Sequence, residues 1–294
     1  MKQILVISGK GGTGKTTLVA ALADLTSKEM KLVLVDADVD AANLELMLDP
    51  DHEQMFIFKA GRTALIDQAL CSQCGCCAEV CRFEAVYKKE GAFFIDAAMC
   101  EGCASCFYQC PAGAIRIEVR TSGEWYRSST PYGKLFHASL HPGEENSGKL
   151  VTQIKHAAAR QAEEENADLM LIDGPPGIGC PITAACRGAD LAVLVSEPTI
   201  SGKHDLARIL EVTDHFGIPA YLVLNKSDLN PLMREEIVSL SQSAGAPLLG
   251  EIPYDERIMA AQSQAVPVTK ALDEELSKYF EEIWLQLKAK IGIF

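Results

Sequence analysis

The hydrophobic residues fall into short, unbroken apolar runs separated by longer stretches with helical spacing. The clearest runs are Ile4–Ile7, Leu32–Val35, Leu169–Ile172, Leu191–Val195 and Ala220–Leu224. Apolar runs of this length without alternation are typical of strands that are buried on both faces of a parallel sheet. We therefore expect an α/β chain in which buried strands alternate with helices.

Helices are expected after several of these strands, at Thr17–Met30, about Leu150–Asn166 and about Ser201–His215. A closing helix carries apolar residues at helical spacing: Leu272, Leu276, Tyr279, Phe280, Ile283 and Leu287. Its polar face is mainly acidic. Because helices that lie on membrane surfaces usually carry a basic polar face, we expect this one to pack on the core instead.

The middle of the chain departs from this pattern. Residues 62–118 interrupt the α/β alternation, and Gly123–Tyr126 and Gly133–Ala138 are expected to be short strands that return to the sheet. Three histidines near this part share no metal-ligand spacing, so we expect them at the surface or in turns: His137, His141 and His156.

A glycine-rich segment, residues 9–17, lies between the first strand and the first helix. Its spacing fits the phosphate loop G-x-x-x-x-G-K-[ST], whose backbone N–H groups surround phosphate oxygens at a helix N-terminus. Lys15 should reach the β- and γ-phosphates, and Thr16 should offer its hydroxyl to Mg²⁺. The nucleotide-binding residues expected here are Gly11, Gly12, Thr13, Gly14, Lys15, Thr16 and Thr17.

Composition narrows the class of protein. The chain has 294 residues, 48% of them hydrophobic, which is enough for one large domain and a small module. A formal net charge of −13 argues against nonspecific nucleic-acid binding. No apolar run is long enough to span a membrane, and the immediate start of a strand leaves no room for a signal peptide, so we expect a cytoplasmic protein.

The eleven cysteines point to metal rather than to disulfides. The spacing C-x2-C-x2-C-x3-C starts at Cys71 and again at Cys100, 29 residues later. This is the spacing of bacterial ferredoxins with two [4Fe–4S] clusters, in which the fourth cysteine of each repeat binds the other cluster. The ligand sets would be Cys71, Cys74, Cys77 and Cys110 for one cluster, and Cys100, Cys103, Cys106 and Cys81 for the other.

Structural zinc and a disulfide staple are the alternatives, although zinc favours C-x2-C pairs separated by a longer loop. Pro111 follows the last cysteine as the ferredoxin pattern expects, but Arg82 occupies the equivalent place after the first repeat. We expect this difference to change the local turn or charge, and with it the reduction potential of one cluster. Cys76 is surplus to the pattern, and we expect it to be a small buried side chain.

Acidic residues follow two of the predicted strands. The strand Leu169–Ile172 closes on Asp173, which is the Walker B arrangement that holds Mg²⁺ through water. Asp36 and Asp38 follow the second strand, at the edge of a parallel sheet where ligands bind, although either could simply cap a helix. The strand that ends at Leu224 leads into Asn225-Lys226-Ser227-Asp228, which resembles the guanine-reading motif of GTPases.

Together these motifs resemble the MinD/Mrp/nitrogenase iron protein class of P-loop ATPases, here with an inserted ferredoxin domain. Lys10, in the phosphate loop, matches the lysine that in this class reaches the nucleotide of a partner subunit, although contact with its own subunit's phosphate is the alternative. The resemblance implies a homodimer closed on ATP, with GTP as the weaker alternative. It also implies a doubly wound, mostly parallel sheet formed by residues 1–61 and 119–294, with a small α+β ferredoxin module at residues 62–118.

The resemblance further assigns roles to single residues. Asp38 would orient the attacking water, Asp36 would support the Mg²⁺ shell, and Asn225 would contact adenine. Pro253 and Asp255 would flank the base. Cys180 lies seven residues beyond Asp173, where the nitrogenase iron protein has a cluster ligand shared across its dimer; packing is the alternative, and Cys186 is a weak second ligand.

The leading hypothesis is an ATPase coupled to two [4Fe–4S] clusters, active in ATP-gated electron transfer or metal-cofactor assembly. Its partner would be a redox protein or an apo-metalloprotein. Two alternatives remain: an Mrp-like carrier that delivers clusters to apoproteins, and a redox-sensing ATPase.

Overall fold

The computed structural model describes residues 1–292, apart from the side chains of residues 262 and 263. The chain divides into two compact units. The first comprises Met1–Phe56, Trp125–Ser139 and Ser147–Phe294, and the second comprises Ile57–Glu124 and Leu140–Asn146. The second unit therefore contains the whole of residues 62–118 and extends beyond them at both ends.

A nine-stranded sheet has the order β11-β10-β9-β1-β8-β2-β7-β6-β3. Its strands are β1 Lys2–Ser8, β2 Leu32–Asp36, β3 Asp51–Ile66, β6 Ile115–Thr130, β7 Gly133–Leu140, β8 Leu169–Pro176, β9 Leu191–Ser196, β10 Ala220–Asn225 and β11 Leu248–Ile252. The pairs from β11 to β7 are parallel. The expected mostly parallel α/β sheet is thus confirmed.

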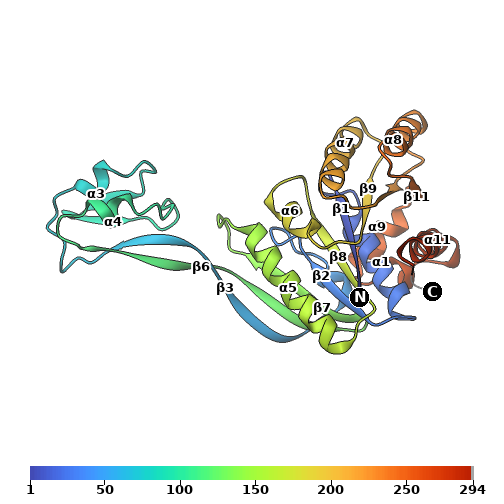
Figure 1. Cartoon of the computed structure of the whole chain (residues 1–294), viewed down its shortest axis with the longest axis horizontal. Helices are drawn as coiled ribbons and strands as arrows, with labels where there is room; N and C mark the ends of the chain where they lie inside the picture. Colours follow the sequence, from blue (N-terminus) through green and yellow to red (C-terminus); the bar gives the residue numbers. More distant parts are fainter. Residues whose placement is uncertain (293–294) are drawn as a thin grey trace. The chain divides into compact units, whose positions relative to one another are not determined.

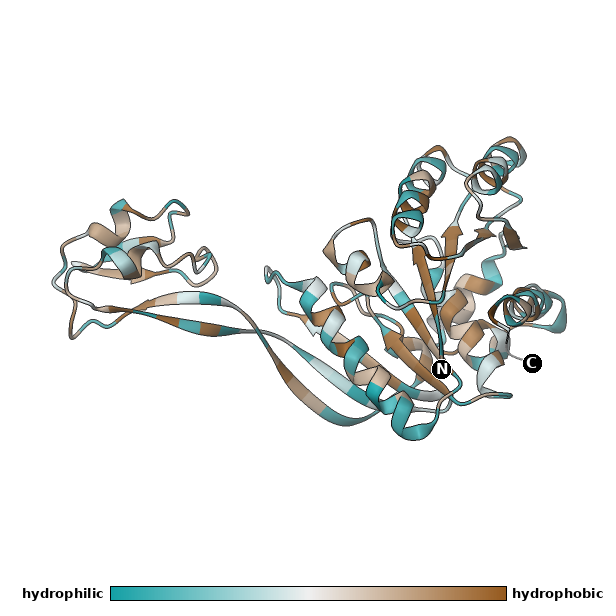
Figure 2. Cartoon of the chain, in the orientation of Figure 1, coloured by the Kyte–Doolittle hydropathy of each residue, from teal (hydrophilic) through white to brown (hydrophobic). Residues whose placement is uncertain are grey.

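Helices cover both faces of this sheet in the first unit (Figure 1). On one face lie α1 Lys15–Ser27, α9 Glu256–Ser263, α10 Val268–Ala271 and α11 Glu274–Ile291, and on the other lie α5 Ser147–Glu165, α6 Cys180–Cys186, α7 Ile200–His215 and α8 Pro231–Ser243. The short α2, Glu45–Leu48, follows β2. The central strands are hydrophobic along their length, as burial of both sheet faces requires, whereas hydrophobic and hydrophilic residues alternate along the helices (Figure 2).

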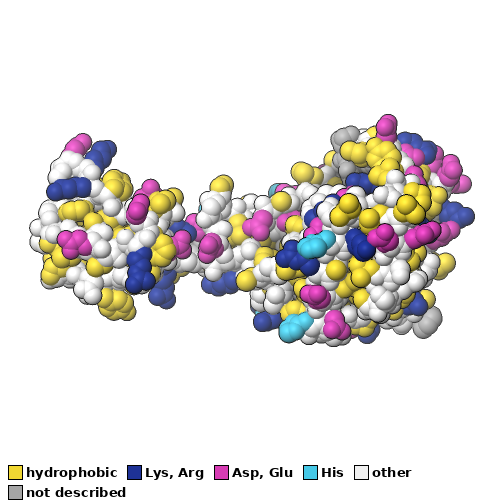
Figure 3. Space-filling model, turned by 90° about the horizontal axis from the view of Figure 1, so that it is seen from above, with side chains coloured by type: hydrophobic (Ala, Val, Ile, Leu, Met, Phe, Trp, Pro, Cys, Tyr) yellow, Lys and Arg dark blue, Asp and Glu magenta, His cyan; other side chains and the backbone are white. Residues whose placement is uncertain are grey.

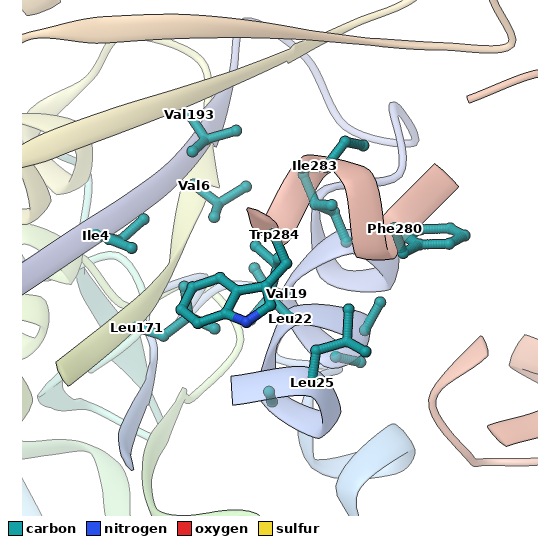
Figure 4. Packing of buried hydrophobic residues seen from close by; sticks show 14 of the residues in the cluster. Ile4, Val6, Val19, Leu22, Leu25, Leu171, Val193, Phe280, Ile283 and Trp284 are labelled. Atoms are coloured by element: carbon teal, nitrogen blue, oxygen red, sulfur yellow. The ribbon is translucent and has the colours of Figure 1, made fainter. Parts of the chain in front are cut away.

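The closing helix packs on the core, as its acidic polar face predicted. Trp284 of α11 points towards the central strands (Figure 4), and Phe280 and Ile283 belong to the same buried cluster as residues of α1. Tyr279 remains 37% exposed. None of the helices in the described residues is long and apolar enough to cross a membrane.

Strands β3 and β6 are longer than the sequence indicated. They are neighbours in the sheet, and each is 16 residues long, although only a short strand near Gly123–Tyr126 was expected. In the first unit Glu53 contacts Arg127, and in the second unit Ser122 binds the Ala60 carbonyl. A residue later in β3 thus pairs with a residue earlier in β6, so the two strands are antiparallel.

The second unit also contains a two-stranded antiparallel sheet and two short helices. These are β4 Val86–Lys89, β5 Ala92–Ile95, α3 Cys76–Glu79 and α4 Ser105–Gln109. Its small core joins Ala64, Cys77 and Ile115 to partly buried neighbours that include three further cysteines. So small a core stabilises a fold only weakly, and such modules usually depend on disulfides or metal.

Candidate functional site

The phosphate loop connects β1 to α1 at the carboxyl edge of the sheet. Gly14 is the N-cap of α1, with a φ of 94°. A Cβ atom at this position would lie 2.4 Å from the Nδ2 atom of Asn225. Only glycine combines this backbone conformation with this close approach, so the loop's shape follows from its sequence.

A cavity of about 520 Å³ opens over this loop. Ten of the predicted residues line it: Gly11, Gly12, Gly14, Lys15, Thr16, Thr17, Asp38, Asn225, Pro253 and Asp255. Thr13, in the same loop, is buried. The apolar part of the lining was not predicted from the sequence; it is formed by Leu46, Met47, Tyr254, Ile258 and Met259. The only sequence signal for these residues is that they lie in the segments that follow β2 and β11.

Asp173 is completely buried beside the phosphate loop. No well-aligned hydrogen bond reaches either of its carboxylate oxygens within the described residues. Burial raises the pKa of Asp173 to about 6, while the charge of Lys15 and the nearby hydroxyl of Thr16 act in the opposite direction. A buried carboxylate with unused oxygens next to a threonine hydroxyl suits a hard cation such as Mg²⁺.

Asp36 is also fully buried, and its carboxylate accepts backbone N–H groups from Asp38, Asn43 and Leu44 at 3.0–3.1 Å. These bonds fix the loop that carries Asp38 into the cavity. Burial raises the pKa of Asp36 well above its usual value, and the charge of Asp173 adds to this. For Asp38, burial raises the pKa while Lys15 opposes the shift.

Lys10 forms contacts within its own chain. Its Nζ lies 2.5 Å from Oε1 of Glu197 and donates to Oγ of Ser201 at 2.9 Å. Glu197 also pairs with Lys226, at 3.1 Å. The lysine expected to reach a partner's nucleotide is therefore held at the N-terminal end of α7.

Asn225 supports the phosphate loop. Its Nδ2 donates to the Thr13 carbonyl at 2.9 Å, and its Oδ1 accepts the N–H of Lys226. The expected contact of Asn225 with adenine stays a prediction. Asp228, the residue that would read guanine, accepts the N–H of Tyr254 at 2.7 Å, so one of its oxygens already has a partner.

The structure groups the cysteines of the second unit around two small cavities. The first is lined by Cys71, Cys74, Cys77 and Cys110, together with Cys76. The second is lined by Cys81, Cys100, Cys103 and Cys106. Each cavity thus contains one of the two sets expected from the repeat, including the exchange of Cys81 and Cys110 between repeats.

No group of three or more His, Cys, Asp or Glu side chains in the described residues could hold a single metal ion. A single ion requires all its ligand atoms within one bond length of one point, whereas a four-iron cluster binds each thiolate at a different iron. Backbone N–H groups of Ala64 and Ala114 point at the sulfurs of Cys100 and Cys110, at 3.5 and 3.3 Å. Such N–H groups stabilise thiolate charge.

Two expectations for single residues were wrong. Cys76 is not buried but half-exposed at the start of α3. His137 is not a surface residue: it is 2% exposed because β7 lies inside the sheet, between β2 and β6. His141 is half-exposed and contacts Glu124, and His156 is exposed.

Cys180 is exposed at the first residue of α6, whereas Cys186 is buried at its end. Burial raises the pKa of the Cys186 thiol to about 11. Within one chain these two cysteines therefore form no pair of accessible ligands.

Comparison with known proteins identifies the nucleotide-binding part. Residues 4–268 match the family described as the CobQ/CobB/MinD/ParA nucleotide binding domain. The uncharacterized protein MJ0578 of Methanocaldococcus jannaschii is 37% identical over 78% of this chain and 79% of its own length. A second protein of that organism, MJ0579, is 27% identical over 96% of both chains. MinD of Pyrococcus horikoshii, solved with Mg-ADP, superposes with a TM-score of 0.59 at 19% identity, covering 99% of this chain and 98% of its own.

Proposed function

The chain belongs to the CobQ/CobB/MinD/ParA nucleotide-binding family and is a P-loop ATPase of the MinD/ParA type; from this premise we propose that it couples an ATP-driven dimer switch to two [4Fe–4S] clusters. The observation that carries the proposal is the cysteine arrangement. The lining of each of two cavities in the second unit includes four cysteines in the crossed pattern of a two-cluster ferredoxin, and Cys76 is an additional cysteine at the first cavity.

In the ATPase part, this chain's residues bind and orient the nucleotide. Lys15 and the loop N–H groups neutralise the phosphates, and Asn225 keeps the loop in shape. Thr16 and Asp173 would hold Mg²⁺, which supplies charge neutralisation at the β- and γ-phosphates. Asp38 faces the cavity from a loop that Asp36 fixes, and it would orient the attacking water.

The second copy of the chain is proposed to cover the nucleotide face. Leu46 and Met259 line the cavity and are 64% and 60% exposed, and Ile200, next to Ser201, is 80% exposed. Apolar side chains exposed around a binding site favour a protein interface there. On closure, Lys10 would leave Glu197 and reach the phosphates of the partner subunit's nucleotide.

The cluster part is proposed to transfer electrons rather than to donate clusters. Each four-cysteine set supplies every iron of one cluster with a thiolate, which suits a resident cluster. The cluster carrier remains the second candidate because Cys180 is exposed, and a second copy could bring two such thiols together. The electron or cluster acceptor would be a redox protein or an apo-metalloprotein. The face in Figure 3 mixes acidic and basic side chains, so it presents no basic footprint for nucleic acid.

Metal analysis of anaerobically purified protein tests the cluster part. We expect about eight irons and eight acid-labile sulfides per chain, with [4Fe–4S] signals in the electron paramagnetic resonance (EPR) spectrum after reduction. Zinc, or no metal, would overturn the proposal. About two additional irons per chain that are lost in Cys180→Ala would favour the carrier.

Sedimentation with ATP tests the switch. We expect wild type to dimerise with ATP but not with ADP, and Lys10→Ala to bind ATP yet stay monomeric. Lys203→Ala is the matched control, because it removes an equal charge near the N-terminal end of α7, where Lys203 pairs with Glu236. Dimerisation of Lys10→Ala equal to that of wild type would contradict the proposed role of this lysine.

A further inference from the structure

The two cysteine cavities differ in one respect that the repeat does not require. Five cysteines line the first cavity, because Cys76 joins the four expected ligands, and four line the second. The Cys76 side chain lines this cavity together with that of Cys74, which lies two residues earlier in the chain. A thiol that is surplus to the cluster pattern thus lies within reach of a predicted ligand.

The internal repeat supplies an equivalent position without a thiol. With the offset of 29 residues, Cys74 and Cys76 correspond to Cys103 and Ser105. Cys76 and Ser105 are the first residues of α3 and α4, and both helices follow a residue in the left-handed conformation. Cys103 contacts Ser105, with 3.5 Å between Sγ and Oγ, and both Cys74 and Cys76 line the first cavity. The two sites therefore share their local geometry and differ in one atom, sulfur or oxygen.

We propose that Cys76 is a reserve ligand of the first cluster, able to take over the iron that Cys74 binds. This inference rests on the two-cluster function proposed above. Iron–sulfur clusters select soft thiolate ligands, so Ser105 is a poor substitute at the second cluster. In the exchange, one iron–sulfur bond to Cys74 breaks and one to Cys76 forms. The proton of the Cys76 thiol passes to the Cys74 thiolate that leaves the iron, and no electron is transferred.

The exchange would make the first cluster more resistant to oxidation than the second. Cys74 and Cys103 are both exposed, so each is the ligand of its set that an oxidant reaches readily. Loss of Cys74 would leave the first cluster with four thiolates, whereas loss of Cys103 would leave the second with three. The second cluster is therefore the more labile one under oxidising conditions.

Matched substitutions in the full chain, purified anaerobically, test this inference by iron content and EPR. We expect about eight irons per chain in wild type and in Cys74→Ala, with altered EPR signals in the variant. Cys103→Ala and the double variant Cys74→Ala/Cys76→Ala should each lose at least one iron. Ser105→Cys added to Cys103→Ala should restore it, because it creates the missing thiol in the equivalent place.

The other possible results distinguish failure of the reserve ligand from failure of the two-cluster function. Equal iron loss in Cys74→Ala and Cys103→Ala, with wild type intact, would overturn the reserve ligand alone. Full iron content in the double variant would do the same, because Cys76 would then not be what retains the cluster. Wild type without iron would overturn the two-cluster function and this inference together.

Discussion

Acidification should destabilise the first unit through His137. This side chain is 2% exposed and lies in a row of hydrogen bonds with Glu45, Ser128 and His52. Nδ1 lies 2.8 Å from a carboxylate oxygen of Glu45, which can only accept, so Nδ1 carries the proton. Nε2 then accepts from the Ser128 hydroxyl at 3.0 Å. With a neutral His137 imidazole, each donor in this row of hydrogen bonds faces an acceptor.

The magnitude follows from the pKa. Burial, with a contribution from His52, lowers the pKa of His137 from 6.5 to about 4. The unfolded chain therefore binds a proton at a pH where the folded chain does not, and stability falls as the pH drops from about 6.5 to about 4. The free energy of unfolding can fall by about 3 kcal/mol at most through this group, and roughly 2 kcal/mol of this should be lost between pH 7 and pH 5.

Urea unfolding at pH 7 and pH 5 measures this loss. Both tryptophans, Trp125 and Trp284, belong to the first unit, so their fluorescence reports on the unit that contains His137. In His137→Gln the difference between the two pH values should shrink by roughly 2 kcal/mol. His156→Gln, at an exposed position of α5, is the control and should behave as wild type.

The reasoning fails if His137→Gln keeps the full pH dependence of wild type. It also fails if the imidazole titrates above 6.5 in a nuclear magnetic resonance experiment, because the Glu45 carboxylate would then outweigh burial. Glu45→Gln separates these two effects: if burial dominates, this variant should leave the titration of His137 nearly unchanged.

Further predictions concern the phosphate loop and the core. Gly14→Ala should weaken ADP binding by about tenfold or more in calorimetry, because the left-handed backbone and the close Nδ2 of Asn225 both oppose a Cβ; unchanged affinity would contradict this. Lys155→Met should lower the free energy of unfolding by about 2 kcal/mol, because it leaves two carbonyls near the end of α6 without their buried donor. Trp284→Ala should cost about 3–5 kcal/mol in the same urea assay, since this side chain is 5% exposed in the main core.

Local sequence patterns predicted much of the ATPase part. The strand before Gly9 and the helix after Gly14 follow from residues close together in the chain, and the structure places them as expected. Three cysteines of each cavity come from one repeat and lie close together in the chain, whereas the fourth comes from the other repeat and was expected only from the ferredoxin pattern. For the phosphate loop, in contrast, the information lies within a few residues.

Features that depend on distant residues were missed. The burial of His137 depends on neighbours from α2, β3 and β6, and no local signal indicates that β7 is covered on both sides. Buried and exposed residues alternate poorly along β3, and all residues of Asp51–Met55 are exposed. Its pairing with β6, rather than its own sequence pattern, therefore makes this segment a strand.

The antiparallel pair of β3 and β6 has a consequence for how such a chain can arise and fold. Both connections to the cysteine-rich segment leave adjacent strands of one hairpin, so in topological terms the segment replaces a β-turn. Chain-closure entropy grows only slowly with loop length, and paired strands already hold the two ends together. A short turn in place of residues 67–114 would leave the order of the nine strands unchanged. Gain or loss of the cysteine-rich segment therefore requires a single event at one hairpin, with no rearrangement of the ATPase.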